Sequence, residues 1–390
     1  MYQPSWLVRQ KARKSLITAE ILSIRNQRDK AEKLIRKTIR ECQKHELYDL
    51  LIGLNHISFI NTCNVKGGER TAQNFEDFQS YLEKERLKKT AEMHMYKYAF
   101  YGINKSSAKP NPKDVLKDIQ KIEHALENGP EVPSAQYFLL QLKTVYWELK
   151  GNFNNQVRFA RQLRHLFVQY PHLSSDIINI NAYLQEFTAL LNLNVHKQAL
   201  EAVREAQKLA VPGTSRYFEI TKNQVYPLIH LGRLHEARQI IEDLLDDERV
   251  QGLMQEKLRY LLCVVLRENG QYGLVSRTLM ELHELPSAER NGWNVGVRFM
   301  EIQNRLENER FDLAETQIQN LKRFMERHNS SLKDRKREVV ILRILLQLSK
   351  LNFDYSALMS NNAELVDLLQ GSGAEYRWDP FGAETIPFDQ

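Results

Sequence analysis

The hydrophobic pattern of this chain alternates long amphipathic segments with short turn sequences. In the stretch from Leu231 to Ala237, one amphipathic segment ends at Gly232, an apolar residue follows at Leu234, and a second amphipathic segment begins around Ala237. Apolar residues at three- and four-residue spacing predict a helix on each side. A glycine between them tolerates the left-handed backbone that commonly ends a helix. The stretch therefore predicts a helical hairpin that turns at Gly232.

The same turn pattern recurs along the chain at a nearly constant interval. A turn residue is followed by an apolar or aromatic residue two places on, a small residue five places on, or both, at Gly151, Asn194, Gly232, Gly270 and Glu309. The intervals between these residues are 43, 38, 38 and 39 positions. A repeat of this length predicts hairpins that each pack on their neighbours. We therefore predict an all-α fold, an array of antiparallel helix hairpins.

Weaker copies of the turn flank the regular block. Asn26 with Ala31 repeats it near the start of the chain, and Leu351 begins a copy near the end. Terminal repeats are commonly atypical because they cap the stack. Pro227 falls inside the first helix of the Gly232 hairpin, where it removes a backbone hydrogen bond. We expect a kink at that point.

The chain divides into four predicted parts. An N-terminal helical region, 1–103, contains helices over 48–60, 71–85 and 87–101 after its first basic helices, and the linker-like loop 104–112 follows it. The repeats cover 113–370. The last part, 371–390, abandons helical periodicity and mixes aromatic residues with Pro and Gly. We predict an extended tail whose aromatic residues dock on the last helices; a free interaction peptide is the alternative, because chain ends are often loose.

Composition places the chain among folded, helix-rich proteins. Apolar residues make up 42% of its 390 residues, and there are only 16 Gly and 11 Pro. The longest apolar run, Leu261 to Leu266, is far shorter than the roughly 20 residues that span a bilayer, and the N-terminus lacks the pattern of a secretory signal. Three separate cysteines, Cys42, Cys63 and Cys263, form neither a disulfide framework nor a zinc motif. We expect a cytoplasmic protein without membrane span, metal or cofactor.

The net charge of +6 originates in the first fifty residues, which contain 12 Lys or Arg against 6 Asp or Glu. Basic residues line one predicted helix in this region, and this basic stripe consists of Lys30, Lys33, Arg36, Lys37, Arg40 and Lys44. Such a surface can follow the phosphates of nucleic acid or anionic lipid. No aromatic residues are interleaved to stack on bases, which weakens the nucleic-acid interpretation. A solvated helix face is the commoner meaning of a charge run.

The repeat pattern resembles the tetratricopeptide repeat. Gly, an apolar residue two places on and Ala five places on are all present at Gly232, Leu234 and Ala237, and part of the pattern occurs at Gly270. The period exceeds the usual one by about four residues, which helices longer by one turn would explain. The resemblance implies a right-handed superhelical solenoid. The sequence Trp-Asp-Pro-Phe-Gly at 378–382 also resembles the end of a bacterial group of repeat proteins without assigned function.

In tetratricopeptide arrays the first helix of each hairpin lines a concave face, so the resemblance implies which side chains would meet a partner. The positions it selects are Asn181, Asn192, Glu219, Lys222, Tyr226, His230, Lys257, Tyr260 and Arg267. Lys222, Lys257 and Arg267 would suit an extended peptide or its terminal carboxylate, because they donate to carbonyl and carboxylate oxygens. Ordinary polarity on the surface of long helices is the alternative.

No spacing typical of catalysis occurs in the sequence. His-Glu-x-x-His and paired Cys-x-x-Cys are absent, and the glycine pair Gly371 and Gly373 follows a predicted helix rather than a strand. We expect a non-catalytic scaffold that binds a protein or peptide on its concave face. One alternative is a regulatory receptor that responds to a ligand or peptide. Nucleic-acid binding through the basic stripe is the weaker alternative.

Overall fold

The structure is a computed structural model that describes residues 4–63, 68–98, 110–282, 292–327, 335–370 and 376–388. Within these ranges every regular element is an α-helix or a short 3-10 turn, so the predicted all-α fold is confirmed. None of the described helices is long and apolar enough to cross a membrane. The chain forms two compact units, Met1–Gln185 and Glu186–Gln390.

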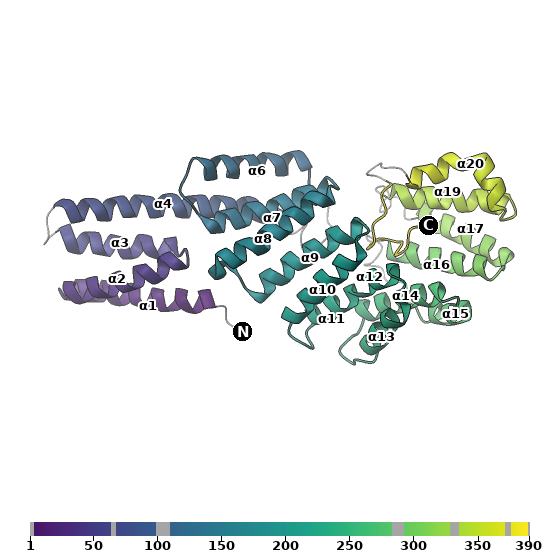
Figure 1. Ribbon diagram of the computed structural model, residues 1–390, viewed down its shortest axis with the longest axis horizontal. Coiled ribbons are helices and arrows are strands. Elements are labelled where there is room, and N and C mark those ends of the chain that lie inside the picture. Colours follow the sequence, from purple (N-terminus) through teal and green to yellow (C-terminus); the bar gives the residue numbers. More distant parts are fainter. Residues whose placement is uncertain are drawn as a thin grey trace. The chain divides into compact units, whose positions relative to one another are not determined.

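In the first unit, helices that follow one another in sequence pack as neighbouring hairpins (Figure 1). Its elements are α1 (Pro4–Ile24), α2 (Arg28–Lys44), α3 (Tyr48–Cys63), α4 (Gly68–Tyr96), α6 (Pro112–Glu127), α7 (Pro133–Leu149), α8 (Phe153–Gln169), the 3-10 turn η1 (Pro171–Leu173) and the first part of α9 (Asp176–Asn192).

The second unit continues the hairpin pattern to the end of the last helix. Its elements after α9 are α10 (His196–Leu209), α11 (Ser215–Asn223), α12 (Val225–His230), α13 (Leu234–Leu245), α14 (Leu253–Glu268), α15 (Tyr272–Met280), α16 (Trp293–Glu307), α17 (Phe311–Arg327), α19 (Lys336–Lys350) and α20 (Tyr355–Gln370). Residues 376–388 follow as an irregular segment of turns and bends, which we call the C-terminal tail. It turns at Asp379–Gly382, and the indole N–H of Trp378 donates a hydrogen bond to the carbonyl oxygen of Glu384 at 2.8 Å.

The predicted turn residues adopt the backbone conformation that the repeat pattern requires. All have a positive φ: Gly151 63°, Asn194 59°, Gly232 68°, Gly270 68° and Glu309 55°. The small residues five places after three of these turns, Ala199, Ala237 and Ala314, are completely buried. A left-handed residue closes the first helix, and a methyl-sized side chain allows the second helix to pack closely on it. In these respects the hairpins are tetratricopeptide-like.

Two local predictions have different outcomes. Pro227 interrupts its helix as expected, because α11 ends at Asn223 and α12 begins at Val225. The prediction of two helices over 71–85 and 87–101 is wrong, since α4 is one helix from Gly68 to Tyr96. The buried residues Tyr81, Leu87 and Ala91 carry one apolar stripe through the expected break.

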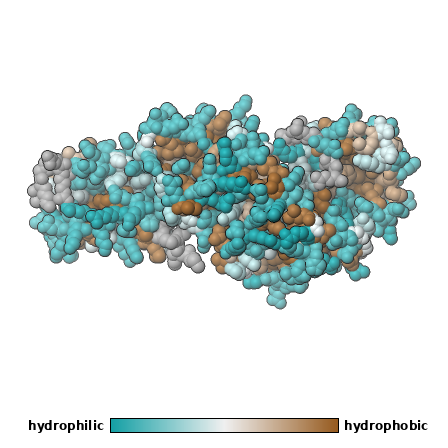
Figure 2. Space-filling model, in the orientation of Figure 1, coloured by the Kyte–Doolittle hydropathy of each residue, from teal (hydrophilic) through white to brown (hydrophobic). Residues whose placement is uncertain are grey.

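Each unit has its own hydrophobic core. In the first unit one cluster joins residues of α2, α3, α4, α6 and α7, so apolar packing is continuous on both sides of the predicted linker-like loop. Residues 99–109 lie outside the described ranges, so that loop stays a prediction. A second cluster joins α16, α17, α19 and α20 to the C-terminal tail through Ala383 and Phe388. Figure 2 shows hydrophilic residues over most of the visible surface, with hydrophobic residues in separate patches.

A buried carboxylate fixes the turn between α2 and α3 in the first unit. Glu46 is 4% exposed, and its oxygens accept hydrogen bonds from the backbone N–H of Ser134 at 3.0 Å and the hydroxyl of Tyr48 at 3.1 Å. The Nε2 atom of His172 lies 2.9 Å from the same carboxylate. Burial opposes ionisation of Glu46, but these partners outweigh it and lower the pKa of the carboxyl group. We call this arrangement the Glu46 junction.

Candidate partner-binding face

The C-terminal tail lies against the first helices of successive hairpins in the second unit. Figure 1 shows it as the yellow segment beside α9, α12 and α16. The residues through which the helices meet the tail are Phe187 on α9, Tyr226 and His230 on α12, Tyr260 on α14, Gly296 on α16 and Arg337 on α19. We call the surface formed by these residues the first-helix face.

Aromatic side chains of the tail pack on aromatic side chains of this face. The ring of Phe381 lies 5.0 Å from that of Tyr226 and 6.0 Å from that of Phe187, both in edge-on geometry. The ring of Trp378 lies 5.4 Å from that of His230. Edge-to-face pairs at such distances add about 0.5–1.5 kcal/mol each to the gain from burial. These contacts hold Trp378 on α12 and Phe381 between α12 and α9.

The imidazole beside Trp378 is neutral at neutral pH. His230 stacks on His196 of α10 with ring centroids 4.4 Å apart and planes only 9° from parallel. Burial is the main cause that lowers the pKa of His230 to about 4, and the neighbouring His196 lowers it further. Burial also lowers the pKa of His196. Two uncharged rings can stack without the repulsion that two imidazolium ions would suffer.

Farther along, the backbone of the tail itself touches the helices. The hydroxyl of Tyr260 donates a hydrogen bond to the carbonyl oxygen of Ala383 at 3.0 Å. On α16, Gly296 faces the same carbonyl: a Cβ atom there would lie 2.5 Å from the oxygen of Ala383. Only glycine leaves room for this approach. The face therefore contacts the backbone of the tail as well as its aromatic side chains.

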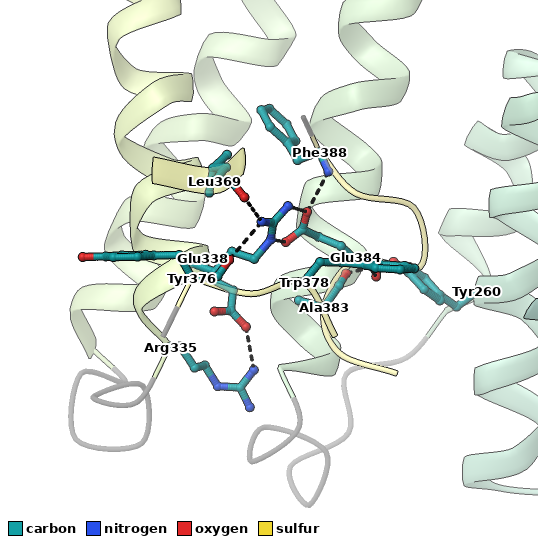
Figure 3. A network of polar contacts seen from close by, with 10 residues as sticks. Tyr260, Arg335, Glu338, Leu369, Tyr376, Trp378, Ala383, Glu384 and Phe388 are labelled. Carbon is teal, nitrogen blue, oxygen red and sulfur yellow. Dashed lines mark hydrogen bonds and ion pairs between the residues drawn. The ribbon is translucent and has the colours of Figure 1, made fainter. Parts of the chain in front are cut away.

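A buried ion pair anchors the tail. Arg337 on α19 holds Glu384 with two hydrogen bonds, from Nε at 2.8 Å and from Nη2 at 3.1 Å, and both residues are less than 10% exposed. A remaining guanidinium nitrogen donates to the carbonyl oxygens of Leu369 and Tyr376. The backbone N–H of Phe388 donates to Glu384, as Figure 3 shows. A buried charge pair is tolerated when its hydrogen bonds are completed in this way.

Three charged residues form a group near Tyr226. Lys222 and Glu219 lie one and two turns before Tyr226, on α11, and Lys257 lies on α14. Lys222 is only 4% exposed and pairs with Glu219. Lys257 is half-buried and makes no hydrogen bond or ion pair with another described residue. Burial lowers the pKa of Lys257, and Lys222 lowers it further. Burial opposes ionisation of Glu219, but the two lysines outweigh it and lower the pKa of that carboxyl group. The group therefore carries one more positive than negative charge.

The predicted site residues fall into three sets. Tyr226, His230 and Tyr260 lie beneath the tail, and Glu219, Lys222 and Lys257 form the charged group just described. The other three residues lie elsewhere or have local partners: Asn181 is in the first unit, Asn192 donates to the carbonyl of Thr188 on its own helix at 2.8 Å, and Arg267 pairs with Glu268 at 2.8 Å and with Gln303.

The basic stripe forms an exposed face of α2. Lys30, Lys33, Arg36, Lys37, Arg40 and Lys44 are all exposed. Lys44 lies 3.5 Å from Glu41 and Lys30 donates to Gln27 at 3.2 Å, both contacts within or next to the same helix. The opposite side of α2 carries the buried residues Ala31, Ile35 and Cys42. The stripe is thus the solvent side of an amphipathic helix.

Reasoning from sequence missed three residues that shape the face. Nothing in the repeat pattern singles out Phe187, Gly296 or Arg337, because their roles depend on where the tail lies. The tail aromatics were expected to dock on the last helices. Tyr376 and Phe388 do pack against the cluster of the last helices, whereas Trp378 and Phe381 contact α12 and α9. The run Ala383 to Thr385 is buried, a signal that the mixed Pro and Gly composition hides.

These hairpins define an all-α helical-repeat protein. No model of a known protein family matches the sequence, and no curated protein matches it. Among solved structures, the chain is similar to the apo form of RapI, with 12% identity over 92% of this chain and 86% of that chain and a TM-score of 0.49. It is also similar to a Rap protein complexed with Competence and Sporulation Factor, with 16% identity, coverage of 92% and 99%, and a TM-score of 0.41. A third structure, a tetratricopeptide-repeat domain, shows 16% identity, coverage of 85% and 87%, and a TM-score of 0.29.

Proposed function

We propose that this protein is a non-catalytic scaffold that binds a peptide, or a segment of a protein, on the first-helix face of its second unit. The observation that carries the proposal is the tail: the face already holds one non-helical segment of chain through aromatic contacts and a hydrogen bond to its backbone. Main-chain bonding combined with pockets for alternate side chains is how grooves commonly recognise peptides.

Charge next to the tail supports a peptide ligand with a carboxylate. Lys257 has a half-buried ammonium group without an ion-pair partner among the described residues, and Lys222 lies close enough to lower its pKa. A ligand carboxylate would complete this group, because charge-assisted hydrogen bonds to lysine are stronger than neutral ones. The carboxylate could belong to an acidic side chain or to a peptide C-terminus.

The test is selection of binding peptides from a display library against the full chain, followed by measurement of their affinity for two variants. Lys257→Glu reverses a charge on the proposed surface, and Lys197→Glu reverses one at an exposed position on α10, a second helix. We expect the selected peptides to lose at least tenfold in affinity for Lys257→Glu and to bind Lys197→Glu like the unaltered chain. Equal affinity for both variants would place the binding surface elsewhere.

A regulatory receptor is the second candidate, and one observation favours it. The tail covers Tyr226, His230 and Tyr260, so a ligand that uses these residues has to change the position of the tail. In a receptor, release of the tail by the ligand would change binding of a second partner, whereas in a scaffold the ligand would only take the place of the tail.

A further inference from the structure

The chemistry of the tail describes the ligand that fits the first-helix face. Reading along the chain, Trp378 meets His230, Phe381 meets Tyr226, and Glu384 meets Arg337. These three residues are evenly spaced, with two residues between each and the next. Their partners lie on α12 and α19, and Tyr260 on α14 and Gly296 on α16 contact the intervening Ala383. The tail thus fills three kinds of site at once: two aromatic sites at His230 and Tyr226, a backbone site at Tyr260, and a cationic site at Arg337.

Each of these sites selects one kind of chemical group. A segment that only shielded the helices from water would not need such selectivity. Arg337 presents its guanidinium in two-pronged geometry to one carboxylate, which discriminates an acidic residue from a neutral one. Gly296 leaves room for the backbone carbonyl of Ala383, because a Cβ atom at this position would lie 2.5 Å from its oxygen. The ring of Phe381 makes edge-on contacts with both Phe187 and Tyr226.

We infer that the tail is an intramolecular ligand, and that the partner of this face is a segment of the same chemistry: an aromatic residue, a second aromatic residue three positions later, and a carboxylate three positions after that. The inference rests on the proposed function and names the ligand class for it. The partner displaces the tail when it binds, so the tail raises the concentration of partner that is needed for binding. We call this concentration the threshold.

The threshold follows from the short connection between α20 and the tail. Residues 371–375 join Gln370 to the tail, and a tethered segment at such a short distance competes at an effective concentration on the order of 1 mM. A free peptide of equal intrinsic affinity therefore loses the competition at micromolar concentration. Weakening the tethered copy lowers the threshold and tightens binding of the free one.

The experiment uses the full chain and a fluorescent peptide that spans residues 375–390, with binding followed by fluorescence anisotropy. The double variant Trp378→Ala with Phe381→Ala removes the aromatic contacts of the tethered copy, so that the peptide can displace that copy from Arg337 as well. We expect it to bind the peptide at least tenfold more tightly than the unaltered chain does. The control variant, Tyr96→Ala with Phe138→Ala, removes an aromatic pair of the first unit and should bind like the unaltered chain.

Peptide variants test the ligand class on the same protein. A peptide with both aromatic residues replaced by Ala should not bind the double variant, and a peptide with Glu384→Gln should bind at least fivefold more weakly. If the double variant fails to fold, as judged by circular dichroism, the single variant Trp378→Ala replaces it, with an expected gain of about threefold. Trp378 is only half-buried, so its loss leaves the core intact.

The outcomes separate this inference from the proposed function. If peptides selected from the library respond to Lys257→Glu but bind the double variant and the unaltered chain equally, the face binds peptides and the tail does not compete. That result overturns the inference alone. Absence of tail-peptide binding to the double variant up to 1 mM, about the effective concentration of the tether, overturns it as well. Loss of the response to Lys257→Glu overturns the proposed function.

Discussion

Glu46 in the first unit and Glu384 in the second are both buried carboxylates, and the two have different structural consequences. Glu46 accepts hydrogen bonds from Ser134 and Tyr48, and all of its partners belong to helices and turns of the array. Glu384 pairs with Arg337, but it belongs to the tail, which lies outside the hairpins. The same physical device therefore fixes one hairpin on another in the first unit and fixes a removable segment on a candidate binding surface in the second. Disrupting the first should affect stability alone, whereas disrupting the second should also open the face.

The largest effect is expected for Glu384→Ala. This variant leaves Arg337 buried without its carboxylate, and removal of one partner of a buried ion pair costs about 3–5 kcal/mol. We expect a loss of that size in the free energy of unfolding, measured in urea, together with faster amide exchange throughout the tail. Glu384→Gln keeps an oxygen acceptor and should lose less. An unfolding free energy that stays within 1 kcal/mol of the unaltered chain, about the net worth of one hydrogen bond, would contradict the anchor.

A somewhat smaller effect is expected for Glu46→Ala. The backbone N–H of Ser134 and the hydroxyl of Tyr48 lose a charged acceptor, which costs about 2–4 kcal/mol for buried groups of this kind. The change should lower the stability of the first unit and leave amide exchange in the tail unchanged. If tail exchange rose as much as in Glu384→Ala, the contrast between the two carboxylates would be wrong.

Gly296→Ala tests the close approach of the tail backbone. Because the added Cβ would lie 2.5 Å from the oxygen of Ala383, the tail or α16 has to shift, at a cost of about 1–3 kcal/mol. Gly273→Ala is the matched control: this glycine is also helical, and nothing lies within 4 Å of the position of its Cβ. The control should gain up to about 1 kcal/mol from helix propensity. The midpoint of thermal unfolding should fall for Gly296→Ala and rise for Gly273→Ala. A change in the same direction for both variants would argue against the contact.

The smallest expected effect is a pH dependence from His230. Its pKa is lowered from 6.5 to about 4 with the tail docked, so the released state takes up a proton at higher pH than the docked state does. Docking should be at full strength above about pH 6.5 and weaken progressively as the pH falls towards 4. We expect a change on the order of 1 kcal/mol, because the ring is partly exposed to solvent.

The pH effect is isolated by comparison with His230→Gln, which cannot titrate in this range. Amide exchange of the tail, corrected for the intrinsic effect of pH, should become faster between pH 6.5 and 4 in the unaltered chain relative to this variant. Parallel behaviour of the two proteins would mean that protonation of His230 is not coupled to docking.

The repeat architecture was predictable from the sequence because it depends on local features. Gly232 and Glu309 occupy left-handed turns that follow from their place in the repeat, and Ala237 is buried for the same reason. The continuous α4 was not predicted, since the polar run around Arg86 obscured an apolar stripe that passes through Leu87. The polar residues predicted a break in the helix, but burial of its apolar face keeps α4 continuous.

The candidate site was predictable only in part, because it depends on contacts between residues far apart in sequence. The repeat spacing selected Tyr226, His230 and Tyr260, which do lie on one surface with the tail. It could not select Gly296 or Arg337, whose importance arises only when Ala383 and Glu384 come to lie beside them. The repeat period identifies positions that are equivalent in every hairpin. The tail contacts a different set of positions in each hairpin, so the period cannot identify them.

Amide hydrogen exchange of residues 376–388 in the full chain, with and without a saturating peptide selected for its sensitivity to Lys257→Glu, tests the central claim most directly. In the free chain, the N–H of Phe388, which donates a hydrogen bond to Glu384, should exchange slowly, as should the other buried amides of the tail. With the peptide bound, exchange across the tail should rise to the rate of an unstructured segment, because ligand and tail use the same surface. A peptide that binds while the tail keeps its full protection would contradict the claim that the first-helix face is the partner site.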